Sequence, residues 1–323
     1  MSSFRPSISF VSPVFNEREN IQLLVDEIED VMRSYPSEWE VWLVDDGSTD
    51  GSRELLDKLV PGRPWLRVLK LTKNFGQTAA ISAGVDHARG EVIVTLDADL
   101  QNDPRDVFCL LDVMSKGYDV VSGWRKHRKD HLFVRTLPSR VANSLISLIT
   151  GVRLHDYGCT LKAYHRDVIK SIRIYGRLHR FIPALCSWRG ASVAEVVVNH
   201  RARVAGRSKY GLSKTFGVAL DLITVKFLLD YTDAPMRVFG GIGAFCGFSG
   251  MCGLGYLSWV KFFLQQPIGD RPLLMISILL VMLSAQLLAL GLLTELSIRI
   301  YYESQGKAVY RLAEQRDVTG KLL

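Results

Sequence analysis

The chain has 323 residues, is 48% hydrophobic and carries a formal net charge of +7. Its five scattered cysteines form no Cys-x-x-Cys pair, which argues against a disulfide framework and a zinc site. The basic charge suits an anionic membrane, a phosphorylated substrate or nucleic acid, but no nucleic-acid-binding motif is present, so nucleic acid is not an expected partner. Residues 1–12 lack the pattern of a signal peptide, so we expect the N-terminal part to stay where it is made.

The first hundred residues alternate between short apolar runs and segments with helical periodicity. We expect strands at 8–14, 39–44, 66–71 and 91–96, and helices at 19–32, 53–59 and 78–88. Repeated strand–helix units of this length predict an α/β fold, a Rossmann-like, mostly parallel sheet covered on both faces. In such sheets ligands bind beyond the carboxyl ends of the strands. No Gly-x-Gly-x-x-Gly follows the first strand, which argues against a dehydrogenase-type dinucleotide site.

Acidic and amide side chains follow the expected strands. Asp97 and Asp99 come directly after the fourth strand, and Gln101 lies two residues further on. Oxygen-rich sites without thiols suit Mg²⁺ or Mn²⁺, and such a metal could neutralise a departing diphosphate. An isolated Asp-x-Asp is more often a solvated or capping pair. Here it follows a strand, and two other strands end at acidic residues, in Asn16-Glu17 and Asp45-Asp46. This placement favours a metal site.

Two basic stretches precede candidate amphipathic helices at about 133–150 and 212–229. The first stretch includes Arg135 and Arg140, and the second includes Arg203 and Lys209. Helices of this kind can lie in the headgroup region with basic residues facing anionic lipid. Ordinary packing against the sheet is the alternative, more for the first helix than for the second, whose apolar arc is wider.

Two segments near the end of the chain are predicted to span a membrane. Residues 238–260 and 273–294 contain no charged residue, and each run can cross a hydrocarbon core of roughly 30 Å. Basic residues flank the outer ends of the hairpin more than its loop, which predicts a multi-pass protein with both termini in the cytosol. Gly243 and Gly247 have the spacing of a helix-contact motif, from which we expect a homo-oligomer. The alternative is a pair of buried helices in a soluble protein.

We therefore expect three parts in the chain. They are a catalytic domain at 1–231, two transmembrane helices within 232–301 (about 236–262 and 272–298), and a cytosolic tail at 302–323.

Several motifs occur in the order and spacing of family 2 glycosyltransferases. They are Pro13-Val14-Phe15-Asn16-Glu17, Asp45-Asp46-Gly47-Ser48-Thr49-Asp50, Asn74-Phe75-Gly76 and Asp97-Ala98-Asp99-Leu100-Gln101. Asp156-Tyr157-Gly158-Cys159, His179-Arg180-Phe181 and the segment from Arg203 to Tyr210 look like the branch that acts on polyisoprenyl phosphates. The two-helix tail is most similar to bactoprenol glucosyltransferases, and the branch includes dolichol-phosphate mannose synthases. The resemblance covers nearly the whole chain and implies the GT-A fold.

The resemblance also implies roles for these residues. Asp97 would lie beside the donor diphosphate, and Asp99 and Gln101 would hold the metal. The expected nucleotide-binding residues are Pro13, Asn16, Glu17, Asp45 and Asp46. Helix capping by Asn16 and Glu17, and turn formation at 45–48, are the structural alternatives and are compatible with binding.

On the acceptor side, the expected phosphate ligands are Arg135, Arg203, Ser208 and Lys209. A phosphate monoester has its second pKa near 6, so it is already largely dianionic at neutral pH and needs positioning more than a general base. We therefore expect Arg203 and Lys209 to act in catalysis by balancing charge, and Asp156 to organise the site rather than to take a proton.

The implied reaction is inverting transfer of a sugar to undecaprenyl or another polyisoprenyl phosphate, at the cytosolic face of the plasma membrane, for cell-surface glycan modification. Glucose from UDP-glucose is the first choice, with GDP-mannose or a UDP-linked modified sugar as alternatives. A processive polysaccharide synthase would carry a Gln-x-x-Arg-Trp motif, but Leu185 stands where the glutamine is required. A catalytically inactive membrane scaffold is the alternative outside enzymes.

Overall fold

The computed structural model describes residues 5–126, 143, 146, 147, 150–172, 174, 178–201 and 235–305. The chain divides into two compact units, Met1–Val225 and Lys226–Leu323. The expected helix at 212–229 and most of the one at 133–150 lie outside the described residues, as does the tail from residue 306.

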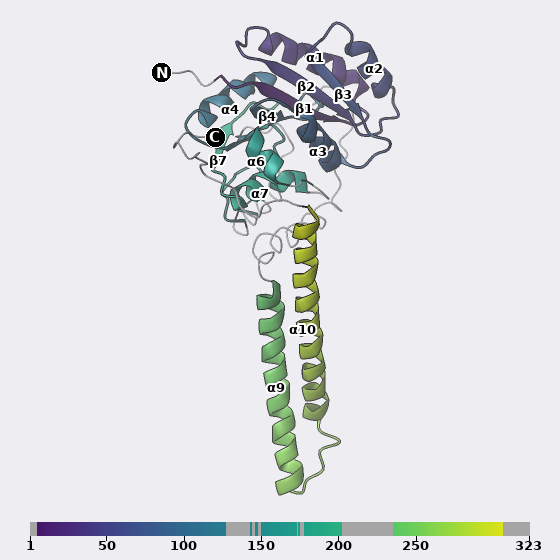
Figure 1. The fold of residues 1–323 in the computed structure, drawn as a ribbon, viewed down its shortest axis with the longest axis vertical. Helices are drawn as coiled ribbons and strands as arrows, with labels where there is room; N and C mark the ends of the chain where they lie inside the picture. Colours follow the sequence, from purple (N-terminus) through teal and green to yellow (C-terminus); the bar gives the residue numbers. More distant parts are fainter. Residues whose placement is uncertain are drawn as a thin grey trace. The chain divides into compact units, whose positions relative to one another are not determined.

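A seven-stranded mixed sheet forms the centre of the first unit (Figure 1). The strands are β1 (Ile8–Val14), β2 (Trp39–Asp45), β3 (Leu66–Lys70), β4 (Val92–Thr95), β5 (Val120–Trp124), β6 (Lys162–His165) and β7 (Val193–Val197), in the order β3-β2-β1-β4-β6-β5-β7. Only β6 runs antiparallel to its two neighbours. The α/β class and the mostly parallel sheet are thus confirmed.

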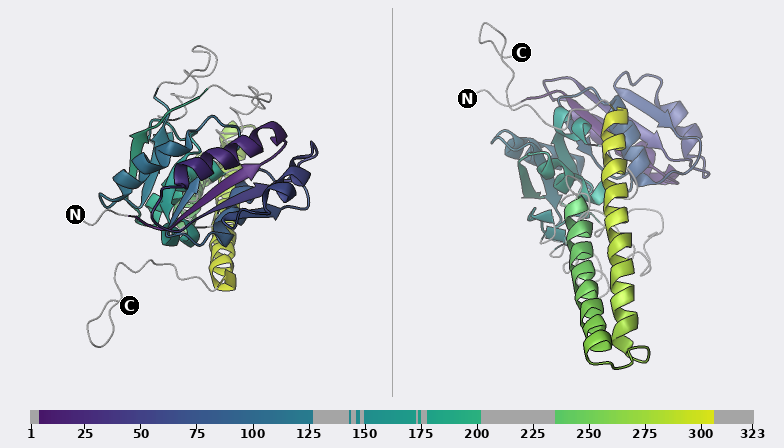
Figure 2. Two further views of the ribbon diagram at one scale, coloured as in Figure 1. Left: turned by 90° about the horizontal axis from the view of Figure 1, so that it is seen from above. Right: turned by 60° about the horizontal axis from the view of Figure 1, so that its bottom comes forward.

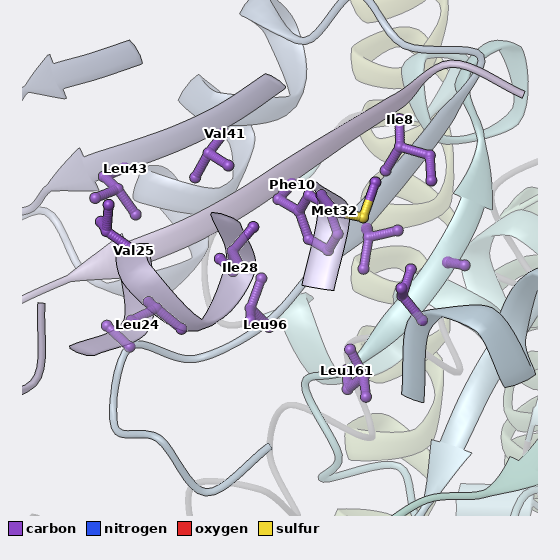
Figure 3. Close-up of a cluster of buried hydrophobic side chains, with 14 of the residues drawn as sticks. Ile8, Phe10, Leu24, Val25, Ile28, Met32, Val41, Leu43, Leu96 and Leu161 are labelled. Atoms are coloured by element: carbon purple, nitrogen blue, oxygen red, sulfur yellow. The ribbon is translucent and has the colours of Figure 1, made fainter. Parts of the chain in front are cut away.

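Helices cover both faces of the sheet. One face is covered by α1 (Arg18–Met32), α2 (Ser52–Leu59) and α4 (Val107–Met114), and the other by α3 (Gln77–His87), α6 (Arg166–Ser171) and α7 (Ile182–Trp188). Successive residues of a strand point to opposite faces, so Phe10 packs with the first group and Val11 with the second. Figure 3 shows Phe10 with Ile28 of α1 in the first cluster. Complete burial of an aliphatic side chain such as Ile28 contributes roughly 1.5–3 kcal/mol.

The ligand edge of the sheet lies where the strand order reverses. From β1 the chain proceeds outward through β2 to β3, and then returns to place β4 on the other side of β1. Pairing between β1 and β4 ends at Val11 and Thr95, so Pro13 lies beyond the last β4 partner, where a missing N–H is tolerated. The carboxyl ends of β1 and β4 therefore mark the position at which doubly wound folds bind ligands.

The second unit contains two long helices, α9 (Pro235–Phe263) and α10 (Pro272–Gln305), which run side by side (Figure 2). Met236–Phe263 and Pro272–Ser297 are long and apolar enough to cross a membrane. Only 17% and 11% of their most apolar windows are buried, which is far below the burial of core helices in a soluble protein.

Four glycines of α9 face α10, namely Gly243, Gly247, Gly250 and Gly253. A Cβ at Gly247 would lie 2.6 Å from Ser284 Oγ, and one at Gly250 would lie 2.8 Å from the Ser277 carbonyl oxygen. Small residues let two membrane helices approach closely. The glycine spacing that led us to expect a homo-oligomer therefore has an explanation within a single chain.

Gly250→Leu is expected to destabilise this hairpin, because the new side chain meets the backbone of α10 and must push the helices apart. Overpacking of this kind typically costs about 1–3 kcal/mol. Gly255→Leu is the matched control, since nothing lies within 4 Å of a Cβ at that position. Thermal unfolding of the purified full chain in detergent should show a lower midpoint for Gly250→Leu than for Gly255→Leu, and equal midpoints would contradict the observed packing.

Candidate active site

The first part of the site is a pair of loops that follow β1 and β2. Asn16 has the left-handed backbone angle φ 54°, which asparagine adopts more readily than most residues. Its N–H donates to Ser48 Oγ at 3.0 Å, and its Oδ1 accepts from the Thr49 N–H at 2.8 Å. Glu17 occupies the N-cap position of α1 but makes no side-chain capping bond. Capping of α1 by the Glu17 side chain, the structural alternative to nucleotide binding, is therefore not observed.

Asp45 and Asp46 are adjacent but have different partners. Asp45 is fully buried, its Oδ2 lies 2.7 Å from Arg53 Nη2, and its Oδ1 accepts from the Ser48 N–H at 3.1 Å, which confirms the turn. Asp46 instead accepts from the N–H groups of Phe75 and Gly76, at 2.7 and 2.9 Å. Burial raises the pKa of Asp46 above its ordinary value, although these two hydrogen bonds oppose the shift. Asp46 thus joins the β2 loop to the start of α3.

Gly47 allows this loop to pack closely. Its φ is +75°, and a Cβ there would lie 2.6 Å from the backbone nitrogen of Asn74. A larger residue would separate the β2 loop from the Asn74-Phe75-Gly76 segment.

The second part of the site is the turn after β4. Asp97 is partly buried and accepts from Gln77 Nε2 at 2.8 Å, whereas Asp99 is buried and accepts from the Gln101 N–H at 3.3 Å. Leu100, between Asp99 and Gln101, has φ 59°, an uncommon backbone conformation for a residue with a side chain. Burial, followed by the nearby Asp99 carboxylate, raises the pKa of Asp97 to about 6.

This turn has the chemistry of a site for a hard cation. Within the described residues no group of three or more His, Cys, Asp or Glu side chains is arranged to hold a metal. Mg²⁺ is commonly bound by one or two carboxylates together with substrate phosphates, rather than by an all-protein cage. The Asp99 carboxylate and the Gln101 amide therefore fit a metal that also takes oxygens from a diphosphate.

The third part is an ion pair between Arg125 and Asp156. Arg125 Nε and Nη2 donate to the two oxygens of Asp156, at 2.7 and 3.1 Å. Burial lowers the pKa of Arg125, but the charge and hydrogen bonds of Asp156, together with Cys159 and Asp97, raise it above its ordinary value, so the guanidinium remains charged. Glu195 of β7 accepts from the backbone N–H groups of His155 and Asp156, both at 3.0 Å.

Lys162 of β6 supports the same segment from inside the sheet. It is almost completely buried, and its Nζ donates to the carbonyl oxygens of Tyr157 and Cys159. Burial lowers the pKa of Lys162 to about 8. The roles of Arg125, Lys162 and Glu195 were not predicted from the sequence. For Lys162 a signal was present, because it is a single lysine within the apolar run that follows Cys159.

His179 was noted only as part of a motif, and the structure gives it a partner on α3. Its Nδ1 lies 2.8 Å from Thr78 Oγ1. Burial, followed by the neighbouring Arg180, lowers the pKa of His179 to about 3, so the ring is neutral at physiological pH.

The structure thus brings most of the expected residues to one edge of the sheet. Pro13, Asn16, Glu17, Asp46, Asp97, Asp99 and Gln101 follow the carboxyl ends of β1, β2 and β4 or lie within them. Arg135, Arg203, Ser208 and Lys209, the expected acceptor residues, lie outside the described residues.

Comparisons with known proteins agree with this geometry. The family model described as Glycosyl transferase family 2 matches residues 9–173. Dodecaprenyl-phosphate galacturonate synthase from Rhizobium johnstonii is 45% identical over 308 residues, which cover 94% of this chain and 91% of that protein. Undecaprenyl-phosphate 4-deoxy-4-formamido-L-arabinose transferase from Yersinia enterocolitica is 36% identical, with coverage of 94% and 91%.

Solved structures show the same fold at low sequence identity. Glucosyl-3-phosphoglycerate synthase from Mycobacterium tuberculosis, in complex with Mn²⁺, UDP and phosphoglyceric acid, gives a TM-score of 0.54 at 18% identity, covering 69% of this chain and 78% of that one. The same enzyme with Mg²⁺ and UDP gives 0.53, again at 18% identity, covering 69% and 79%. The expected GT-A fold is thereby confirmed. Together with the family match over residues 9–173, these findings show that the chain is a glycosyltransferase and belongs to glycosyl transferase family 2.

Proposed function

We propose that this protein transfers a sugar from a nucleotide donor to a polyprenyl phosphate, and that the sugar is galacturonate or a similarly modified sugar carried on UDP. The observation that carries the proposal is the 45% identity, over 94% of the chain, to a dodecaprenyl-phosphate galacturonate synthase. UDP-glucose was the first choice from the sequence, but the two named relatives carry galacturonate and a formamido-arabinose in their names. The modified-sugar alternative is therefore favoured over glucose and over GDP-mannose.

On the donor side, we assign the nucleoside pocket to Pro13, Asn16, Glu17 and Asp46. Asp45 would stabilise the loop that forms this pocket, since its carboxylate is already bonded to Arg53 and to the Ser48 N–H. Asp97 would lie beside the donor diphosphate.

We assign Asp99 and Gln101 to a divalent metal, Mg²⁺ or Mn²⁺. When bound there, the metal would neutralise the charge that develops on the departing nucleoside diphosphate. Asp99 is buried in the turn, and its Oδ1 accepts from the Gln101 N–H at 3.3 Å.

On the acceptor side, the nucleophile is a phosphate oxygen that is already ionised at neutral pH, so no general base is required. Both oxygens of Asp156 are bonded to Arg125, which supports an organising role for this carboxylate. Arg135, Arg203, Ser208 and Lys209 would hold the lipid phosphate, and arginine can grip phosphate oxygens bidentately. A single displacement at the anomeric carbon would invert its configuration.

We further propose that α9 and α10 anchor the protein in the plasma membrane with both termini in the cytosol. The two helices are joined by a short connection, and basic residues are more frequent outside the hairpin than in its loop. A reporter fused after Leu323 should therefore be cytosolic, and one inserted in the loop at 265–271 should be outside. A cytosolic loop reporter would mean that the hairpin does not cross the membrane.

A transfer assay distinguishes the possible donors. The purified full chain would be supplied with Mn²⁺, a short polyprenyl phosphate, and UDP-galacturonate, UDP-glucose or GDP-mannose in separate reactions. We expect UDP-galacturonate to give the highest kcat/KM. Faster transfer from UDP-glucose would restore the original choice of donor, and no transfer from any sugar nucleotide would favour the inactive scaffold.

A further inference from the structure

The turn that carries Asp99 and Gln101 is bordered by the segment that follows β7. Asn102 and His200 form an isolated antiparallel bridge, and the Arg201 N–H donates to the Gln101 carbonyl oxygen at 2.9 Å. The end of the β7 segment therefore lies directly against the turn after β4.

The Arg201 side chain ties this turn to α1. Its Nη1 lies 2.9 and 2.8 Å from the two carboxylate oxygens of Glu27, and its Nη2 lies 2.7 Å from Asp103 Oδ2. The other Asp103 oxygen accepts from the Arg105 N–H at 3.0 Å and so caps η1 (Pro104–Asp106). The Arg201 guanidinium thus connects α1 with Asp103, two residues after Gln101.

A neighbouring contact strengthens the same connection. The Asn199 backbone N–H and side-chain Nδ2 donate to the two oxygens of Asp106, at 2.7 and 3.1 Å. Asp106 and Asp103 are the two ends of the short segment that leads into α4, so both ends are held by the strand extension after β7.

The turn has features that require such support. Leu100 is in the left-handed region, where a side chain is unfavourable, and such conformations persist only when the surroundings fix them. Without neighbours that hold it, this turn would relax, and the positions of the Asp99 and Gln101 side chains would change.

We propose that Arg201 is a positioning residue for the metal-binding turn, because its guanidinium holds Asp103 against Glu27 and so fixes the orientation of Gln101 and Asp99. This proposal rests on the proposed role of Asp99 and Gln101 as metal ligands. Arg201 would affect the metal through the turn, not by contact with it.

Metal binding by the full chain tests the proposal. Free Mn²⁺ would be titrated against protein in detergent and followed by its electron paramagnetic resonance signal, with and without UDP. Arg201→Ala is expected to bind Mn²⁺ about tenfold more weakly than the unsubstituted protein, since loss of residues that orient metal ligands typically costs 10–100-fold in affinity. Arg201→Lys should recover part of the loss, because an ammonium keeps one carboxylate contact but not the fork.

Arg63→Ala is the matched control. Arg63 also joins two carboxylates, with Nη2 3.0 Å from Asp26 and Nε 3.5 Å from Glu29, and its side chain is similarly exposed, at 23% against 34% for Arg201. Arg63→Ala should alter the thermal midpoint as much as Arg201→Ala does, while leaving the Mn²⁺ affinity unchanged.

The outcomes separate the positioning role from the metal site. If Asp99→Asn abolishes Mn²⁺ binding but Arg201→Ala binds normally, the positioning role is overturned and the metal site stands. Equal weakening by Arg63→Ala would reduce the effect to general stability and would also overturn the role. If the unsubstituted protein binds no Mn²⁺ with or without UDP, the metal assignment and the positioning role fail together.

Discussion

Asp99→Asn is expected to lower sugar transfer by at least about a hundredfold while leaving the thermal midpoint of the protein within a few degrees of its original value. Substitution of residues that only orient metal ligands typically lowers metal affinity or activity 10–100-fold. Loss of a charged ligand should therefore lower activity by at least about a hundredfold. Folding should survive because asparagine has nearly the same shape as aspartate. The substitution also removes a negative charge that repels the Asp97 carboxylate and raises its pKa. The measurement is initial-rate transfer to polyprenyl phosphate beside a thermal melt in detergent.

The chelator provides the second half of this test. Transfer by the unsubstituted protein should stop in EDTA and return with excess Mg²⁺ or Mn²⁺. Asp112→Asn is a suitable control, since Asp112 is exposed on α4 and pairs only one turn away with Lys116 at 3.0 Å. Full activity in chelator would show that the turn after β4 does not work through a metal.

Asp156→Ala is expected to lower the free energy of unfolding by about 3–5 kcal/mol, because it leaves the Arg125 guanidinium enclosed without a counter-charge. Only 16% of the Arg125 side chain and 4% of the Asp156 side chain is exposed. The Gly158 N–H, 3.1 Å from Asp156 Oδ1, also loses its acceptor. For a globular unit of this size the thermal midpoint should fall on the order of 10 °C.

Two variants make this result specific. Asp30→Ala breaks the exposed pair with Arg33, whose side chains are 70% and 73% exposed, and should cost less than about 1 kcal/mol. The double variant Arg125→Ala with Asp156→Ala should be more stable than Asp156→Ala alone, because no buried charge remains unpaired. A melt of Asp156→Ala close to that of the unsubstituted protein would mean that the pair does not hold this segment.

The same residue offers a check on the mechanism. If Asp156 organises the site, Asp156→Asn should lose activity without changing the pH at which the remaining activity is half-maximal. A lost acidic limb in the pH profile would instead make Asp156 the general base.

Much of the first hundred residues could be predicted because their pattern is local. The helix expected at 19–32 is observed at Arg18–Met32, and the strand expected at 91–96 is observed at Val92–Thr95. The apolar spacing in α1 places Ile21, Leu24, Val25 and Ile28 on one buried face, which reflects only the 3.6-residue turn of the helix. The two apolar helices near the end of the chain were predicted for the same reason, since length and absence of charge depend on no other segment.

The polar residues after the strands could also be predicted, because all parallel strands end at one edge of a sheet. The sequence did not distinguish Asp45 from Asp46. Their partners, Arg53 and the N–H groups at the start of α3, depend on how the helices pack. Likewise, Gly243 and Gly247 suggested a contact between chains until their closeness to α10 was known.

Only the tertiary structure could place β6 antiparallel between β4 and β5, or bring Asp156 to Arg125, 31 residues earlier in the chain. The contacts of Glu195 with the Asp156 segment and of Arg201 with Glu27 are longer still in sequence separation. Hydrophobic periodicity specifies which face of a strand or helix is buried, but it carries no information about which distant segment covers that face. The sequence therefore determined the elements and the polar edge of the sheet, and the pairing of distant strands decided which charged side chains meet there.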